Sequence, residues 1–193
     1  MLGLVLLNVW LGLAAQVNLG SNMWLDWTVS GSTITFDFGV ASSLKQAKRW
    51  VGISFKDASG SRNMKDSDVI MFDFDNLDNI YDMWATRDEL PDTDATNDVS
   101  TYYTHEVANG YYVFTFKRDL NTGDSMDYSL LNIDQVQIQW AYGPMSSNGD
   151  FLEHGKSSSE LGAVVVYISD GSIVPSSQAN YLLATVGLLL LLV

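Results

Sequence analysis

The sequence predicts an all-β fold in which two antiparallel sheets pack into a β-sandwich of about nine or more strands. Three observations indicate this fold. Apolar and polar residues alternate with a period of two through most of the 193 residues, no window keeps the helical period of 3.6, and turn-forming residues separate the alternating runs. Because a half-buried strand exposes every second side chain, this pattern is typical of strands that place one face in a core.

The first five alternating runs cover residues 23–29 (MWLDWTV), 32–40 (STITFDFGV), 50–55 (WVGISF), 68–74 (DVIMFDF) and 79–86 (NIYDMWAT). Ser30-Gly31 lies between the first two runs. It predicts a hairpin with a two-residue turn, because glycine accepts the positive φ that the favoured hairpin turns require.

Four further runs cover residues 99–107 (VSTYYTHEV), 110–118 (GYYVFTFKR), 135–142 (QVQIQWAY) and 161–168 (LGAVVVYI). Asn109-Gly110 predicts a second hairpin between the first two of these runs, for the same reason. Neither a repeat nor a linker interrupts residues 20–168, so the runs form one domain. Many short strands separated by turns favour an immunoglobulin-like sandwich.

The N-terminal end of the chain predicts a secretion signal. Residues 2–15 are largely apolar and close on the small residues of GLAAQ, although no lysine or arginine precedes them. A buried N-terminal strand is the alternative. We therefore expect residues 1–15 to be a signal peptide and residues 16–170 to be the sandwich domain of a secreted protein.

The C-terminal end predicts attachment to the outer face of the plasma membrane. Residues 181–193 are almost wholly apolar but too few to span a bilayer, which takes about 20 residues. Small residues at 169–172 and a polar spacer through Asn180 precede them, the order found in a glycolipid-anchor signal. Residues 171–193 are thus expected to be spacer and hydrophobic tail, with a short membrane anchor or a hydrophobic strand as the alternatives.

Composition excludes several classes of function. The chain has no cysteine, which rules out disulfides, thiolate metal sites, cysteine nucleophiles and covalently attached c-type haem. Its formal net charge is −13, with only 10 lysines and arginines and no basic stripe, so nucleic acid is not an expected partner.

Histidine content excludes most catalytic metal sites. The only two histidines are His105 and His154, too few for a three-histidine zinc site or for a copper oxygenase. No HExxH motif, nucleophile elbow or phosphate-binding glycine loop is present. His105 lies inside a predicted strand and reads as an ordinary surface or hydrogen-bonded histidine.

Met64 and His154 are the first candidate site. Each lies in a polar loop between predicted strands, where both can meet at one end of a sandwich. A methionine sulfur and an imidazole nitrogen together form the axial pair of many electron-transfer haems. The alternative is that Met64 packs against neighbouring residues and that His154 is solvated.

Two further features are candidates for ligand binding. The loop DELPDTDATNDVS carries five carboxylates and Asn97, which are oxygen ligands of the kind Ca²⁺ takes, or it is a solvated acidic loop. Aromatic residues make up 12% of the chain. Most of the tryptophans are expected in the core, and an exposed line of them can stack on sugar rings.

Five segments follow one another in an order that resembles the DOMON domain, the extracellular β-sandwich of dopamine beta-monooxygenase relatives and of the cellobiose dehydrogenase cytochrome domain. The family patterns are Gly-Trp-x-Gly-x-Gly-Phe, Met-x-x-Ala-Asp-Val, a proline with paired aspartates, Phe-x-Arg-x-Leu followed by Asp-Tyr, and Trp-x-x-Gly with a histidine. The matching segments are RWVGISF (49–55), NMKDSDVIM (63–71), LPDTDATND (90–98), FTFKRDLNTGDSMDY (114–128), and QWAYG through HG (139–155).

The resemblance implies a cofactor and a metal. It implies that Met64 and His154 are the axial ligands of a b-type haem, and that Asp94 and Asp98 belong to a site for Ca²⁺ or another cation. Arg49 and Ser54 stand where the family has glycines, so the pocket that they border is expected to differ.

The resemblance also implies a role in electron transfer. The copper and flavin domains that accompany this domain in the family's enzymes are absent from the sequence, so we expect no enzymatic activity of the chain's own. We expect a one-electron carrier at the cell surface with a redox partner protein. The alternatives are a module that binds a surface glycan or another ligand, with or without Ca²⁺, and a structural coat protein.

Overall fold

The computed structural model describes residues 15–45, 49–74, 76, 77, 79–107 and 109–175, and between 101 and 107 it describes the backbone together with the side chain of Tyr103. The predicted signal peptide up to residue 14, and the predicted tail beyond residue 175, lie outside the described residues. Within the described part of the chain, no helix is long and apolar enough to cross a membrane.

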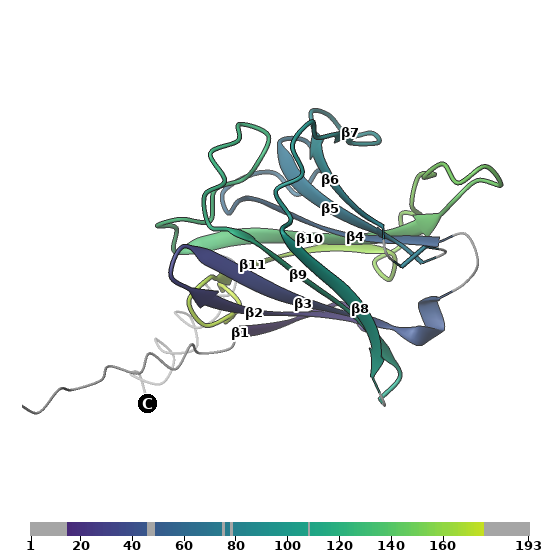
Figure 1. Ribbon diagram of the computed structural model, residues 1–193, viewed down its shortest axis with the longest axis horizontal. Helices are drawn as coiled ribbons and strands as arrows, with labels where there is room; N and C mark the ends of the chain where they lie inside the picture. Colours follow the sequence, from purple (N-terminus) through teal and green to yellow (C-terminus); the bar gives the residue numbers. More distant parts are fainter. Residues whose placement is uncertain (1–14, 46–48, 75, 78, 108, 176–193) are drawn as a thin grey trace, which may run out of the picture.

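Two antiparallel sheets pack face to face, which confirms the predicted β-sandwich (Figure 1). The first sheet has the strand order β1 (Ala15–Leu19), β2 (Met23–Ser30), β3 (Thr33–Ala41), β9 (Tyr111–Asp119) and β8 (Thr101–Val107). The second sheet has the order β11 (Leu161–Tyr167), β10 (Gln135–Pro144), β4 (Arg49–Asp57), β5 (Ser67–Asp73), β6 (Ile80–Ala85) and β7 (Asp92–Thr93). A short 3₁₀ helix, η1 (Ser42–Leu44), lies on the connection from β3 to β4.

All nine predicted strands are present, and the described residues add β1 and β7. The predicted hairpin between β2 and β3 is present, but its two turn residues are Gly31 and Ser32, one position later than predicted, with Gly31 at a φ of 63°. Gly110, at a φ of 83°, lies in the turn before β9. Both glycines therefore adopt the left-handed backbone that their turns require.

The main core lies between the sheets and is rich in phenylalanine. Phe72 of β5 packs against Phe114 of β9 with ring centroids 4.5 Å apart, and Phe36 of β3 packs against Phe55 of β4 at 5.1 Å. All four side chains are fully buried. Such aromatic contacts between facing sheets add to the burial of apolar area, so they set how closely the sheets approach.

The second sheet is also covered on its outer face, which the alternating pattern does not predict. Every residue of β5 is buried, and so is nearly all of β4. A smaller apolar cluster occupies this outer face and consists of Trp50, Val69, Met71, Met83, Ala85 and Met145. The loops that cover the sheet here contain Met64 and Phe151, which pack against this cluster.

Candidate functional site

A cavity of about 620 Å³ lies on the outer face of the second sheet. Its floor is formed by residues that alternate with the core residues of their strands, namely Gly52, Ser54, Val69, Met71, Gln139 and Ala141. Gly52 is the Cα partner of both Ala141 and Met71 across the sheet. Small side chains at two neighbouring floor positions leave open space above the strands, because little extends from them toward the loops.

Met64 and His154 both line this cavity. Met64 lies in the loop that joins β4 to β5, and His154 lies in the loop that joins β10 to β11. Both side chains are partly buried. The fold therefore brings the two side chains to one cavity although they are ninety positions apart in the sequence. Their role as ligands stays a prediction.

The His154 ring is oriented by its neighbours. Its Nδ1 lies 2.8 Å from the carbonyl oxygen of Gly155. Because a carbonyl only accepts, Nδ1 carries the proton in this hydrogen bond, and Nε2 of the neutral ring is left with its lone pair. The Trp50 ring lies edge-on to the imidazole at 6.2 Å, and its Nε1 donates to the Leu152 carbonyl at 3.0 Å. These contacts place the loop and leave one ring nitrogen able to bind a metal.

The Met64 loop is tied to the segment that follows β6. Asp88 accepts two hydrogen bonds from this loop, one from the Lys65 backbone N–H at 3.1 Å and one from the Asn63 amide at 3.2 Å. Asp88 to Pro91 line the cavity beside Arg62. The cavity thus has a floor that combines apolar residues with Ser54 and Gln139, and charged residues at its rim.

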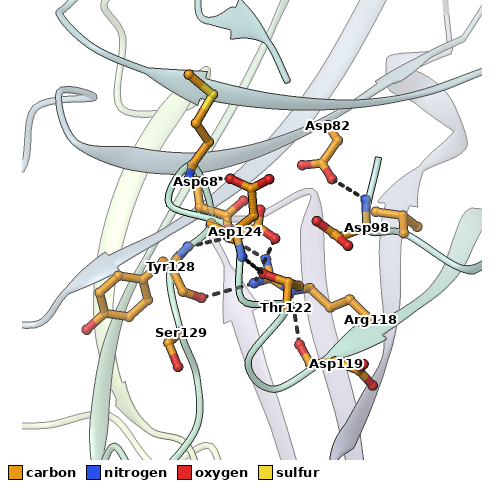
Figure 2. A network of polar contacts seen from close by, with 12 residues as sticks. Asp68, Asp82, Asp98, Arg118, Asp119, Thr122, Asp124, Tyr128 and Ser129 are labelled. Atoms are coloured by element: carbon orange, nitrogen blue, oxygen red, sulfur yellow. Dashed lines mark hydrogen bonds and ion pairs between the residues drawn. The ribbon is translucent and has the colours of Figure 1, made fainter. Parts of the chain in front are cut away.

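A second polar site lies between the sheets at one end of the core (Figure 2). Arg118 follows Phe116 on the core-facing side of β9 and is 2% exposed, and it forms an ion pair with Asp68 of β5. Its guanidinium also donates to the Tyr128 carbonyl at 3.1 Å, and the Tyr128 N–H donates to Asp68 at 3.1 Å. These bonds link the two sheets and the turn that follows β9.

Three carboxylates converge beside this arginine. One oxygen each of Asp68, Asp82 and Asp127 lies within 4.8 Å of the others. Arg118 Nη2 is 3.7 Å from Asp127, whose two carboxylate oxygens are buried without a hydrogen-bond partner within the described residues. One guanidinium against three carboxylates leaves an excess of negative charge in a buried place, so protons or a cation must balance it.

The pKa values of two of these groups reflect their burial. Burial raises the pKa of Asp82 to about 7, while the hydrogen bond from the Asp98 backbone N–H opposes the change. Burial also raises the pKa of Asp68 to about 6, against the attraction of Arg118. Arg118 opposes the rise through a direct contact at Asp68, whereas at Asp82 desolvation outweighs its more distant attraction.

The comparisons with known proteins place this architecture in a family. The family model described as DOMON domain matches residues 19–143. This chain belongs to the DOMON domain family. The matched segment of the DOMON domain includes Met64 and ends before His154. No curated protein sequence matches the chain.

Solved structures show a similar fold. The cytochrome domain of cellobiose dehydrogenase from Myriococcum thermophilum has a TM-score of 0.53 at 16% sequence identity, over 86% of this chain and 86% of that chain. The cytochrome b domain of pyranose dehydrogenase from Coprinopsis cinerea has a TM-score of 0.49 at 13% identity, over 83% of each chain. The first likeness shows that the DOMON domain shares its fold with a cytochrome domain.

The predicted metal residues Asp94 and Asp98 both contact Asp82. The Asp98 N–H donates to the Asp82 carboxylate at 2.9 Å, and the Asp94 N–H donates to the Asp82 carbonyl at 2.9 Å. Burial and the nearby Asp127 raise the pKa of Asp98. Asp94 accepts the Thr96 N–H at 3.0 Å. The convergent carboxylates are thus Asp68, Asp82 and Asp127, and the metal-binding role of Asp94 and Asp98 stays a prediction.

Aromatic residues occur on both faces of the DOMON domain. Trp27 and Trp50 are buried, whereas Trp24 is partly exposed on the outer face of the first sheet. Trp24 packs closely on Gly39, since a Cβ on that glycine would be 1.9 Å from the indole. The ring centroids of Trp24 and Tyr111 are 6.4 Å apart. The side chain of His105, on β8, lies outside the described residues.

Sequence reasoning missed Arg118, Asp68, Asp82 and Asp127 as one group, and it missed Lys56 as part of the cavity's support. A signal was present for most of them. Lys56 directly follows the run VGISF, Arg118 lies two positions after Phe116, and Asp82 lies between Tyr81 and Met83 within a strand. A charge at such a position is rarely buried unless it has a partner, but the partners come from other strands.

Proposed function

We propose that this DOMON domain binds haem b non-covalently in the cavity, with Met64 and His154 as axial ligands, and that it carries single electrons. The observation that supports this proposal best is that the two side chains, from separate loops, line one cavity. The cavity volume of about 620 Å³ falls within the range of about 300–1,000 Å³ that is usual for ligand and cofactor sites.

The residues present fit such a group. Trp50, Met71 and Phe151 give the cavity apolar walls, and His154 has a ring nitrogen free to bind iron. At the rim, exposed Arg62 and Lys156 are the cations available to a ligand that carries carboxylates, beside the carboxylates of Asp88, Glu89 and Glu153. Haem b bound here supplies a one-electron couple at its iron, with a potential that the methionine sulfur raises.

The proposed ligand pair, Met64 and His154, decides which kind of chemistry the site supports. If Met64 and His154 both hold the iron, no position would be left for oxygen or a substrate. The hydrogen bond from His154 to Gly155 keeps the imidazole plane in place. This arrangement supports electron transfer rather than catalysis, and the likeness to a cytochrome domain supports the same role.

Titration of the full chain with haem b tests the proposal. We expect uptake of one equivalent and a low-spin, six-coordinate spectrum that is lost in Met64→Ala and in His154→Ala, because each variant removes one axial ligand. Met126→Ala serves as the matched control, since Met126 is 37% exposed and lies away from the cavity. Wild-type protein that takes up no haem, or ligand variants that keep the wild-type spectrum, would contradict the proposal.

We also propose a location and a partner. The predicted secretion signal and glycolipid-anchor signal favour a protein held at the outer face of the plasma membrane. A net charge of −13 favours a redox partner with a positively charged docking face, because opposite charges steer association. A surface glycan is the alternative partner, for which partly exposed Trp24 offers a flat aromatic ring.

A second candidate function is cation binding at Asp68, Asp82 and Asp127. The unpartnered buried oxygens of Asp127 favour it, because Ca²⁺ takes carboxylate ligands of this kind. At pH 8 we expect Ca²⁺ at 100 times its Kd to raise the Tm by roughly 5–10 °C, from about 2.7 kcal/mol of linkage. Asp127→Asn should remove most of this increase. A Tm that does not respond to Ca²⁺ would leave protons as the balancing charge.

A further inference from the structure

The Met64 loop lies on a buried lysine. Lys56 is the last buried residue of β4 and is only 4% exposed. Its Nζ donates to the Lys65 carbonyl at 2.5 Å and to the Asn63 carbonyl at 3.1 Å. These two carbonyls belong to the residues immediately before and after Met64. The ammonium therefore holds the backbone on both sides of the methionine.

A buried glutamine holds the same place in the loop. The Gln139 side-chain amide donates to the Asn63 carbonyl at 2.9 Å. Its own oxygen accepts from the hydroxyls of Ser54 at 3.1 Å and Ser67 at 3.3 Å. Because both hydroxyls contact the oxygen, the amide nitrogen is directed at the loop. The Asn63 carbonyl thus receives two buried donors.

These contacts are costly to leave unsatisfied. Burial lowers the pKa of Lys56, while the carboxylates of Asp66 and Asp88 act to keep it charged. A buried ammonium needs acceptors, and here backbone carbonyls of one loop supply them. Gly60 fits against the lysine chain, since a Cβ there would lie 3.0 Å from Lys56 Cε. The loop and the lysine are therefore mutually dependent.

We propose that Lys56 and Gln139 are positioning residues that hold residues 58–66 folded over the sheet and direct Met64 into the cavity. This inference rests on the proposed role of Met64 as a haem ligand. Lys56 does not line the cavity, and Gln139, which lies on its floor, acts on Met64 through the Asn63 carbonyl. If the hydrogen bonds from Lys56 and Gln139 to the loop are removed, Met64 would leave the iron more often. An added ligand would then compete for the vacated position.

Two near-isosteric substitutions test the hydrogen bonds that Lys56 and Gln139 make with the loop. Lys56→Met removes the ammonium, and Gln139→Glu replaces only the donor that faces the Asn63 carbonyl. Lys65→Met, exposed in the same loop, and Gln135→Glu, on the same strand, are the matched controls for charge. In haem-loaded protein we expect both test variants to bind imidazole about tenfold more tightly than the wild type, because a charge-assisted or buried hydrogen bond no longer favours the Met64-bound state.

Trypsin digestion of the haem-free full chain tests the loop without the cofactor. Arg62 lies inside the loop, so cleavage after it reports local opening. We expect cleavage about tenfold faster in Lys56→Met and Gln139→Glu, and wild-type rates in the controls. If the wild type takes up no haem, the haem proposal fails, but this digestion still tests whether Lys56 and Gln139 hold the loop in place. Test variants that keep wild-type cleavage and wild-type imidazole affinity would overturn the inference.

Discussion

Asp82 is a buried carboxylate that forms no hydrogen bond or ion pair with the one arginine of its site within the described residues. It accepts the Asp98 N–H, and burial raises its pKa to about 7. Asp68 differs because Arg118 contacts it directly, and its pKa is raised only to about 6. Burial thus raises the pKa of both carboxylates, and Arg118 opposes the rise through a direct contact at Asp68.

The titration of Asp82 predicts how stability depends on pH. Its pKa in the folded protein lies above the ordinary value of 3.8, so the folded state binds the proton more tightly than the unfolded state. The stabilisation is complete below pH 4 and is lost as the pH rises toward 7. Without divalent cations, we expect the loss of this stabilisation to lower the Tm by about 5 °C between pH 5 and pH 8.

Thermal melts of Asp82→Asn measure this contribution. The variant cannot titrate at this position, so its Tm should change less with pH than that of the wild type. Asp134→Asn, which alters an exposed carboxylate, should keep the wild-type dependence. Equal pH dependence in wild type and Asp82→Asn would mean that Asp82 is ionised throughout this range.

Among the strands, β4, β5 and β10 contribute to the core with one face and to the cavity with the other. Their inner faces contribute to the main core, and their outer faces form the floor of the cavity. The covering loops are attached by side chains from that floor, such as Gln139 to Asn63 and Trp50 to Leu152. A strand with polar donors on its outer face can therefore fix a loop without regular secondary structure.

Filling the cavity from β10 tests its role apart from the ligands. Ala141 lines the cavity beside Gly52 and is partly exposed. Ala141→Trp should abolish uptake of haem b, because the indole occupies the space, while the Tm falls by less than about 4 °C since the core is unchanged. The control is Thr28→Trp, at an exposed position of the other sheet, which should bind haem as the wild type does. Full uptake by Ala141→Trp would place haem elsewhere.

At the scale of the whole molecule, the two candidate sites lie on opposite faces of the second sheet. The cavity is on the outer face, and the Arg118 site lies between the sheets. Asp68 and Val69, adjacent on β5, point to the two different sites, since successive side chains of a strand alternate. A change in packing at β5 therefore reaches both sites.

The strands and the residue types available for chemistry follow from local patterns along the chain. Period-two alternation and turn glycines are local signals, so they placed nine strands and the hairpin at Gly31 correctly. The lack of cysteine and the scarcity of histidine also need no structure to interpret. A short strand such as β7, with two exposed residues in an acidic loop, lacks such a signal.

Only the tertiary structure decided which of those residues meet. It brought Met64 and His154 to one cavity, and it grouped Asp68, Asp82 and Asp127 around Arg118. Contacts of this kind depend on strand order, on register and on which face a loop covers. These are long-range properties, because side chains far apart in the chain become neighbours only after the sheets pair and pack.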